Sequence, residues 1–450
     1  MHTHHTRTMT EGNIYGHLFH LFLPLIFGNL LQQFYNTIDA LVIARYAGNE
    51  EFAAIGIAGT VMNLFLFIIV GSCTGLSVLF ARYYGMKDYK RLRKQHFISL
   101  IFGLILVSVL CLSGSLGMRG ILHLIHTPAN LLGYTSTYLW WIFLSLPAAF
   151  LYNMYAAALR SSGDTVAALV ILAAAVFSNL LLDIFLVAHL GLGIKGAAQA
   201  TAFTQLISAV LCLCYLLRAH PEFVLRKEDC KFDKTFLNTT FQCSMVTALH
   251  QASLYIGKML VQGTINTGGT EIISAYTAAT RIEGFANSFS DSGSAATSVL
   301  VSQNYSTGNV TRTRDSFHCS LRFTFILGTI CALILYFSAP ITVKAMLGNA
   351  ASHPVMAKSG IIYLQYISFF YPLCYTGGTF TGTYNGLGKM VLTLAGSTLQ
   401  ISLRVILTWF FFPHFGLAAT AIATGIGWLS ANVFWFICLT RLHRRSLLQA

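Results

Sequence analysis

Long apolar runs, separated by short polar segments, follow one another from residue 17 to residue 440. A helix of about 20 apolar residues is long enough to cross the hydrocarbon core of a membrane. The pattern therefore predicts twelve transmembrane helices, at 17–46, 52–84, 95–118, 130–159, 165–188, 194–218, 236–264, 272–305, 317–347, 354–386, 389–412 and 416–440. We expect an all-α polytopic membrane protein.

Composition supports this class: 55% of the residues are hydrophobic and only 10% are charged, whereas soluble domains carry roughly 25% charged residues. The net charge is +13. With the N-terminus inside, 20 of the 28 Lys and Arg fall in cytoplasmic segments, which is the positive-inside bias. The charge thus reports topology rather than a nucleic-acid partner, and it predicts a multi-pass protein of the cell (plasma) membrane with both termini cytoplasmic.

The two halves of the chain resemble each other. Residues 77–100 (SVLFARYYGMKDYKRLRKQHFISL) align without gaps to 298–321 (SVLVSQNYSTGNVTRTRDSFHCSL), and GIKGAAQAT at 193–201 matches GLAATAIAT at 416–424. Matches in order at nearly one offset indicate duplication. Because each half contains six helices, an even number, corresponding helices of the two halves cross the membrane in the same direction. The two halves therefore form a parallel repeat.

The repeat predicts a cytoplasmic tail (1–16), an N-lobe (17–218), a cytoplasmic linker (219–235), a C-lobe (236–440) and a basic cytoplasmic tail (441–450). Two such lobes suit alternating access around a central cavity. Duplication is also a simple route to a larger helix bundle that has no transport role. The polar residues inside the spans must therefore distinguish a transporter from a bundle of that kind.

Polar residues of the N-lobe lie at helical spacing. The first span carries Asn29, Gln32, Asn36 and Asp39 on one face, and the others are Asn179 and Asp183 on the fifth span, Asn153 on the fourth and Thr201 on the sixth. Amides can simply hold helices together. An ionised Asp at the bilayer centre costs about 2.5–3.5 kcal/mol on insertion scales, so Asp39 and Asp183 indicate that ionisation matters. Such carboxylates suit a proton or a sodium ion, and the sequence does not separate the two.

The C-lobe lacks acids at the equivalent positions, since Leu260 and Ile406 stand there. Lys258 either pairs with Glu283 or Asp291 or contacts substrate. The substrate-cavity candidates of both lobes are Asn36, Gln32, Tyr35, Gln251, Tyr255, Lys258, Gln262, Glu283, Asn287 and Arg404.

Several segments carry a family resemblance: the run from MTEGNIYGHLFHLFLPL to DALVIARYAG, then GLSVLFARYYGMKDYKRLR, LYNMYAAALRSSGDT, NLLLDIFLVAHLGLGIKGAAQAT, TAATRIEGF and SVLVSQNY. From about Thr10 to Leu439 the chain resembles the multidrug and toxic compound extrusion family, in particular its bacterial members. The resemblance implies two six-helix lobes and export driven by proton or sodium antiport.

The resemblance also implies site roles. In proton-coupled relatives an N-lobe site carries the coupling: Asp39 matches its span-1 acid, and Asn179 and Asp183 its span-5 pair. Asn153, Tyr138 and Thr201 match supporting polar positions, and Pro24 matches a span-1 proline where the helix is proposed to bend. The tenth span here has no acid, so the sodium site that other members build in the C-lobe is not expected.

We therefore expect a secondary active exporter of amphipathic small molecules, embedded in lipid as a monomer, with an ion gradient and no cofactor or metal as its energy source. A flippase for lipid-linked saccharides is the alternative, favoured by Lys258, Arg281 and Arg404. A membrane-embedded enzyme lacks support, since the sequence has no HExxH, GxSxG or Walker motif.

Overall fold

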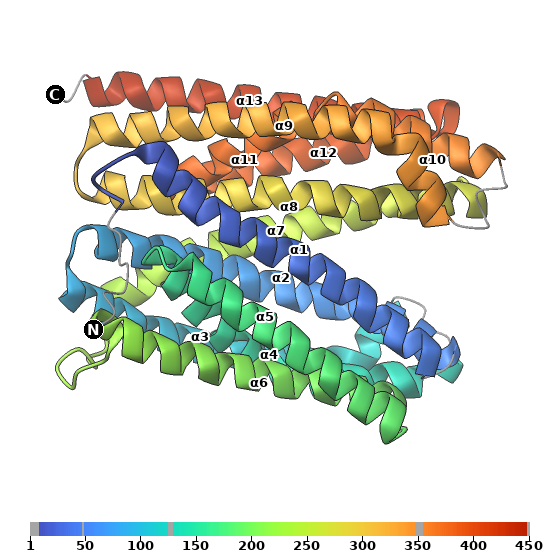
Figure 1. Cartoon of the computed structure of the whole chain (residues 1–450), viewed down its shortest axis with the longest axis horizontal. Helices are drawn as coiled ribbons and strands as arrows, with labels where there is room; N and C mark the ends of the chain where they lie inside the picture. Colours follow the sequence, from blue (N-terminus) through green and yellow to red (C-terminus); the bar gives the residue numbers. More distant parts are fainter. Residues whose placement is uncertain (1–8, 47–48, 125–128, 348–353, 448–450) are drawn as a thin grey trace. The chain divides into compact units, whose positions relative to one another are not determined.

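The protein is almost entirely helical in the part that the computed structural model describes, which is residues 9–46, 49–124, 129–347 and 354–447 (Figure 1). Within these helices, the side chains of 35–46, 49, 50, 52, 53, 60, 124, 129, 130, 270 and 442–447 lie outside the description. Nine helices in these ranges are long and apolar enough to cross a membrane. The α-helices are α1 (Ile14–Tyr46), α2 (Asn49–Gly85), α3 (Tyr89–Leu124), α4 (Ala129–Ser161), α5 (Thr165–Asp183), α6 (Gly193–Ala219), α7 (Lys234–Asn266), α8 (Thr270–Ser306), α9 (Val310–Leu347), α10 (Pro354–Ser368), α11 (Tyr371–Gly386), α12 (Met390–Phe415) and α13 (Leu417–Leu447).

The tenth predicted span differs from the others, because two helices, α10 and α11, stand where the apolar run predicts one. Pro372 is the second residue of α11. A proline has no backbone N–H to donate, and its ring clashes with the preceding turn, so a helix restarts at such a residue more easily than it passes through.

The fifth predicted span also changes character along its length. It begins as α5, with the Asp164 side chain accepting from the N–H of Ala167 as an N-cap. At Ile184 it becomes a π-helix, η1 (Ile184–His189). Such segments are rare and are often found at functional sites. Asp183 is the last residue before this change.

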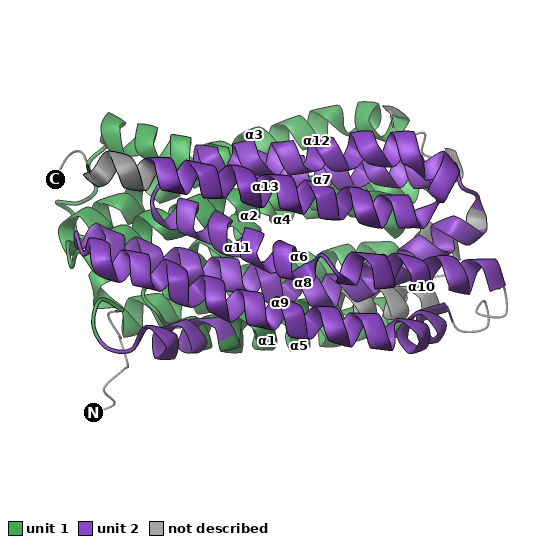
Figure 2. Cartoon of the chain, turned by 90° about the horizontal axis from the view of Figure 1, so that it is seen from above, with its two compact units in different colours: residues 1–11, 23–248 green, residues 12–22, 249–450 purple. Residues whose placement is uncertain are grey.

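The chain forms two compact units, shown in green and purple in Figure 2. Unit 1 consists of residues 1–11 and 23–248, and unit 2 of 12–22 and 249–450. These units differ from the predicted lobes at two places: residues 12–22 of α1 group with unit 2, and the first part of α7 groups with unit 1. α1 leaves unit 2 just before Pro24.

Close backbone packing explains why α7 begins in unit 1. A Cβ at Gly71 would lie 2.7 Å from Ala248 Cα, and one at Gly75 would lie 2.7 Å from Cys243 O. Two glycines one helical turn apart let α2 approach the α7 backbone, as small residues do between membrane helices. Gln95 of α3 adds a hydrogen bond from Nε2 to Thr240 Oγ1 at 2.8 Å.

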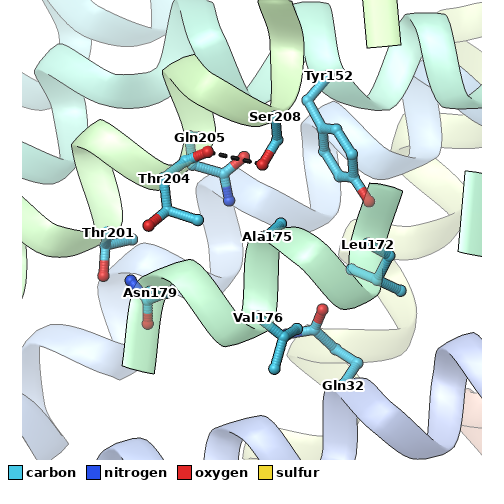
Figure 3. Close-up of a pocket in the computed structure, with 10 residues that line it drawn as sticks. All are labelled: Gln32, Tyr152, Leu172, Ala175, Val176, Asn179, Thr201, Thr204, Gln205 and Ser208. Carbon is cyan, nitrogen blue, oxygen red and sulfur yellow. Dashed lines mark hydrogen bonds between the residues drawn. The ribbon is translucent and has the colours of Figure 1, made fainter. Parts of the chain in front are cut away.

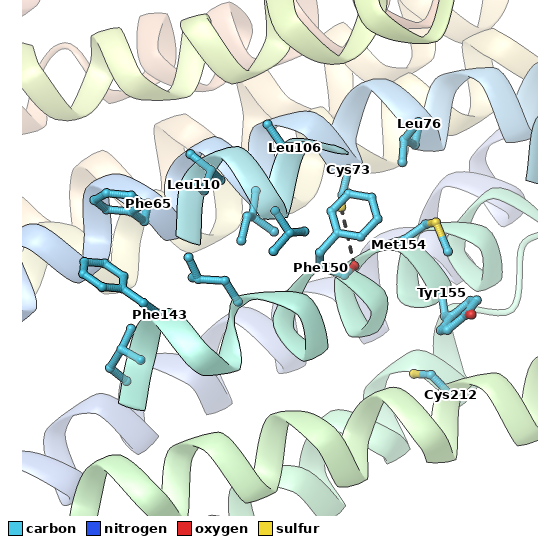
Figure 4. Close-up of a cluster of buried hydrophobic side chains, with 14 of the residues drawn as sticks. Phe65, Cys73, Leu76, Leu106, Leu110, Phe143, Phe150, Met154, Tyr155 and Cys212 are labelled. Carbon is cyan, nitrogen blue, oxygen red and sulfur yellow. Dashed lines mark hydrogen bonds between the residues drawn. The ribbon is translucent and has the colours of Figure 1, made fainter. Parts of the chain in front are cut away.

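The apolar core of unit 1 lies between α2, α3, α4 and α6 (Figure 4). The rings of Phe65 and Phe143 have centroids 5.0 Å apart. Phe150 fills the place where a side chain at Gly103 would be, so only glycine fits there. This packing fixes α4 and α6, the helices that hold part of the site described below.

Unit 2 has its own core around α8, α9, α10 and α11. Gly378, Gly382 and Gly386 form a stripe at a spacing of four on α11, and a Cβ at any of them would press on the backbone or side chains of α8. Tyr375 donates its hydroxyl to Ala286 O at 2.7 Å and ties the two helices together.

Candidate functional site

A small polar cavity lies inside unit 1 between α1, α4, α5 and α6 (Figure 3). Its volume is about 60 Å³. The lining residues are Gln32, Tyr152, Leu172, Ala175, Val176, Asn179, Thr201, Thr204, Gln205 and Ser208. The cavity thus brings together three of the residues predicted from the sequence, Gln32, Asn179 and Thr201.

The polar wall of the cavity comes mostly from α6. Thr201, Thr204, Gln205 and Ser208 stand at positions i, i+3, i+4 and i+7, which is one face of a helix. Ser208 donates to Thr204 O at 2.6 Å, within the helix. Of this face only Thr201 is among the residues predicted from the sequence, although the other three have the same helical spacing as the polar residues of the first span.

The close approach of α1 to α5 helps to shape the opposite wall. A Cβ at Gly28 would lie 3.4 Å from Leu172 Cδ2, which is ordinary van der Waals contact, so α1 and α5 are closely packed at this point. Gln32 lies one turn further along α1 and lines the cavity. The Gln32 amide thus faces the cavity next to a close contact between α1 and α5.

Asp183 and Asn179 are both buried in the last turn of α5, at 1% and 2% exposure. Asn179 lines the cavity, and Asp183 follows it by one turn, at the junction with η1. A carboxylate this deeply buried in a span is costly unless it is protonated, paired or hydrogen-bonded. The two residues therefore place a buried carboxyl group one helical turn from an amide that lines the cavity.

Other predicted N-lobe residues lie apart from the cavity lining. Asn153 donates from Nδ2 to Ala149 O at 2.8 Å in its own helix. Tyr138 is buried, with its hydroxyl 3.9 Å from the sulfur of Met62. The side chains of Tyr35, Asn36 and Asp39 lie outside the described residues, so their predicted roles stay predictions.

Unit 2 contains a buried cluster of charged and phenolic side chains. Tyr363 donates its hydroxyl to Glu283 Oε2 at 2.8 Å, and the Tyr363 ring packs edge-on against Tyr276 at 5.3 Å. Arg404 reaches the Tyr276 hydroxyl from Nη2 at 3.3 Å. The predicted residues Glu283 and Arg404 are therefore joined through two tyrosines that the sequence analysis did not select.

Lys258 lies close enough to Glu283 and Asp291 to act on both electrostatically. In the described ranges it makes no ion pair within 4.0 Å, and its side chain is exposed. A direct ion pair, one of the two alternatives for Lys258, is therefore not formed among the described residues, and substrate contact stays a prediction. An exposed ammonium inside the predicted span 236–264 is expensive in lipid, which favours contact with water or a polar ligand.

The remaining C-lobe candidates do not join this cluster through any described hydrogen bond. Gln262 donates from Nε2 to Asn266 Oδ1 at 2.8 Å, one turn along the same helix. Asn287 accepts a weak hydrogen bond from the Cys374 thiol, at 3.9 Å. Gln251 and Tyr255 are half-buried on α7. They remain cavity candidates by their position alone.

A second polar cluster stands outside the spans of unit 1. His220, just after α6, has Nε2 3.3 Å from Asp164 Oδ2 and Nδ1 3.1 Å from Glu222 Oε1. Burial by itself lowers the pKa of His220, but hydrogen bonds to the two carboxylates outweigh it and raise the pKa to about 9. Burial raises the pKa of Asp164, and hydrogen bonds from His220, Ala167 and Tyr215 more than reverse this, so its pKa lies below the usual value.

Over the described residues, no three His, Cys, Asp or Glu side chains are grouped so that they could hold a metal ion. The polar cavity of unit 1 offers amide and hydroxyl groups instead, which suit hydrogen bonds to water or to a carboxyl group.

Comparisons with known proteins give the family. The MatE family model matches residues 24–185 and 246–410. The probable multidrug resistance protein YpnP of Bacillus subtilis (strain 168) is 24% identical over 443 residues, which is 95% of each chain. A FAD transporter of Shewanella oneidensis is 24% identical over 328 residues, 72% of each chain.

The fold agrees with this result. A crystal structure of MATE in complex with MaL6 superposes with a TM-score of 0.92, at 20% sequence identity, over 100% of both chains. An identity this low establishes the shared fold and no more. The family model, however, matches most of both six-helix halves, so the chain belongs to the MatE family of membrane transporters and is not an enzyme.

Proposed function

We propose that this protein exports amphipathic organic compounds across the cell membrane in exchange for protons. The N-terminus and C-terminus are cytoplasmic in this proposal, the protein acts as a monomer, and the ion gradient replaces any cofactor as the energy source. Membership of a family that includes multidrug resistance proteins supports the export of small molecules. The choice of the proton rests on the site in unit 1.

The observation that carries the proposal is the size and lining of the unit 1 cavity. A volume of about 60 Å³ is enough for a few water molecules. Drug-sized ligands need pockets of about 300–1,000 Å³. A cavity lined by Asn179, Thr201 and Gln32, with Asp183 one turn away, therefore suits protons and water better than substrate.

The geometry suggests how a proton would act there. Protonation of Asp183 removes the cost of holding a charge at 1% exposure. By helical spacing, Asp39 is predicted on the same face of α1 as Gln32, two turns further along the helix. There it would bind protons together with Asp183. Neutral and ionised acids favour different surroundings, so loading and release would bias two conformations of the transporter.

Pro24 is proposed as the hinge for that change. It interrupts the hydrogen-bond ladder of α1 and lies next to the point where the chain passes from unit 2 to unit 1. A bend there would move the Gln32 face without disturbing the first turns of the helix.

A second feature bears on the substrate. Lys258 and Arg404 give unit 2 two cations within its spans, and the FAD transporter is a relative. We therefore include zwitterionic or weakly anionic aromatic compounds among the proposed substrates, beside monovalent cations. Glu283 and Asp291 keep the local charge balanced, so cations are not excluded.

The test is transport in proteoliposomes with separately imposed gradients. Purified full-length protein would be reconstituted into proteoliposomes together with a fluorescent amphipathic substrate. Transport of this substrate would be measured with a pH gradient alone, with a sodium gradient alone, or with neither. We expect the pH gradient alone to accelerate flux. Acceleration by sodium alone would assign sodium as the coupling ion, and flux of lipid-linked saccharide without any gradient would favour the flippase.

A further inference from the structure

A groove on unit 2 runs between the first turns of α1 and the middle of α9. It has a volume of about 200 Å³. Its lining is apolar except at one end, and consists of Tyr15, Phe19, Arg322, Phe323, Ile326, Leu327 and Ile330. A groove of this kind is distinct from the polar cavity of unit 1 in both its position and its chemistry.

Arg322 stands at the edge of the apolar part of α9. The next charged residue along the helix is Lys344, so 21 uncharged residues separate the two. At 1.5 Å per residue these residues span about 32 Å, close to the thickness of the hydrocarbon core. Arg322 is therefore at the level where phosphate headgroups begin, at the predicted cytoplasmic end of the span.

The Arg322 guanidinium is available to a ligand. Its side chain is exposed, and it makes no hydrogen bond or ion pair with any residue that the structure describes. Phe323, the next residue along α9, also lines the groove, and Ile326 and Ile330 follow at 59% and 49% exposure. A single cation at the head of an apolar groove is complementary to an anion that carries a long apolar tail.

We propose that this groove binds one anionic phospholipid, with the phosphate on Arg322 and an acyl chain along Phe19, Ile326 and Ile330. The guanidinium fork matches a phosphate group in two hydrogen bonds. Anionic lipids concentrate at the cytoplasmic surface, and each Lys or Arg near that surface adds to their attraction. The acyl chain fills a space that the side chains of unit 2 leave open.

The bound lipid would also hold the start of α1 in place. Phe323 packs edge-on against Phe19 at 4.9 Å and against Phe22 at 5.0 Å. Arg312 donates from Nη1 to Gly12 O at 2.9 Å. The groove shares the Phe19 and Phe323 rings with this contact, so a lipid that occupies it adds packing to both helices.

The experiment measures lipid retention by the full-length protein. Delipidated protein in detergent would be titrated with phosphatidylglycerol or phosphatidylcholine and examined by native mass spectrometry. We expect wild-type protein to retain phosphatidylglycerol preferentially, and Arg322→Gln to bind it about fivefold more weakly. Arg322→Lys should keep most of the preference. Arg314→Gln is the matched control, because Arg314 is exposed on the same helix but does not line the groove.

A second variant tests the apolar part independently. Ile326→Trp keeps Arg322 and fills the groove, so it should also lower phosphatidylglycerol retention. Equal retention of the two lipids by wild-type protein would overturn the proposal, as would unchanged retention by Arg322→Gln or Ile326→Trp. These outcomes do not depend on transport, so they are separate from the test of proton coupling.

Discussion

His220 and Asp164 form an ion pair where α4 and α6 end in unit 1, with His220 Nε2 3.3 Å from Asp164 Oδ2. The His220 side chain is 2% exposed. Tyr215 donates its hydroxyl to the same carboxylate oxygen at 2.9 Å. Since Asp164 also caps α5, one carboxylate connects the start of α5 to the end of α6.

The first prediction concerns stability at alkaline pH. The pKa of His220 is about 9 in the folded protein and about 6.5 when unfolded. A raised pKa contributes stability that is complete below pH 6.5 and is lost as pH rises through 9. We expect wild-type protein to lose about 1–3 kcal/mol over this window, measured as a fall in melting temperature in detergent between pH 6 and pH 10.

The control for this prediction is His220→Gln, which cannot titrate. Other groups also titrate above pH 9, so the relevant quantity is the difference between the two proteins. That difference should be largest at pH 6 and close to zero at pH 10. A constant difference across the range would show that folding does not raise the pKa of His220.

Sequence patterns predicted the helices well, because the lipid environment constrains each span separately. Within the described residues, nine of the twelve predicted spans contain a helix that is long and apolar enough to cross a membrane. Every predicted span contains a helix, and the 3.6-residue spacing that selected Gln32 and Asn179 places both at one cavity. Partners between distant helices are harder to predict. Nothing in the local pattern indicates that Tyr363 donates to Glu283, or that Arg404 reaches Tyr276, because those contacts depend on how α8, α10 and α12 pack.

The change from α5 to a π-helix after Asp183 is a further example. The segment IFLVAH at 184–189 has no glycine or proline that would mark the change. By contrast, the α6 stripe of Thr204, Gln205 and Ser208 was visible as a spacing. Such a stripe does not by itself indicate a site, because small polar side chains are common in membrane helices.

The second prediction tests the coupling acids. Asp183→Asn removes the titratable group but keeps the shape and hydrogen-bonding capacity of the side chain. We expect it to reduce pH-driven export in proteoliposomes to the level of protein-free vesicles, and we expect the same for Asp39→Asn. Both variants should fold, since an amide avoids the cost of a buried charge.

The matched control is Asp315→Asn, which changes an exposed carboxylate on α9. Its export should equal that of wild-type protein. If Asp39→Asn and Asp183→Asn both transport at full rate, the two acids are not the coupling residues.

The third prediction concerns Lys258. If this ammonium contacts substrate, Lys258→Ala should weaken the binding of zwitterionic and weakly anionic aromatic compounds about tenfold, the usual effect of one charge-assisted hydrogen bond. Monovalent cations should bind equally well or better. Affinities can be measured by quenching of a fluorescent substrate. Arg281→Ala, which removes another exposed cation on the neighbouring helix α8, is the control.

An unchanged drug profile in Lys258→Ala would assign a different role to the lysine. In that case it serves only to balance Glu283 and Asp291, which it influences electrostatically. Reduced melting temperature without any change in affinity would be the expected signature.

The last prediction is that transport depends on membrane voltage as well as pH. A proton that enters while a neutral or zwitterionic molecule leaves moves one net charge. Each uncompensated charge gains about 2.3 kcal/mol per 100 mV, compared with about 1.4 kcal/mol from one pH unit. Export of a monovalent cation in exchange for one proton moves no net charge, so voltage should not affect it.

The measurement uses valinomycin and potassium to remove the voltage while the pH gradient stays constant. Export of a zwitterion should then slow more than export of a monovalent cation. Asp183→Asn provides the baseline, because without a titratable acid at the end of α5 neither substrate should respond. If both substrates are exported at equal rates with and without voltage, no net charge crosses the membrane in a transport cycle. That result would point to an exchange other than one proton for one substrate molecule.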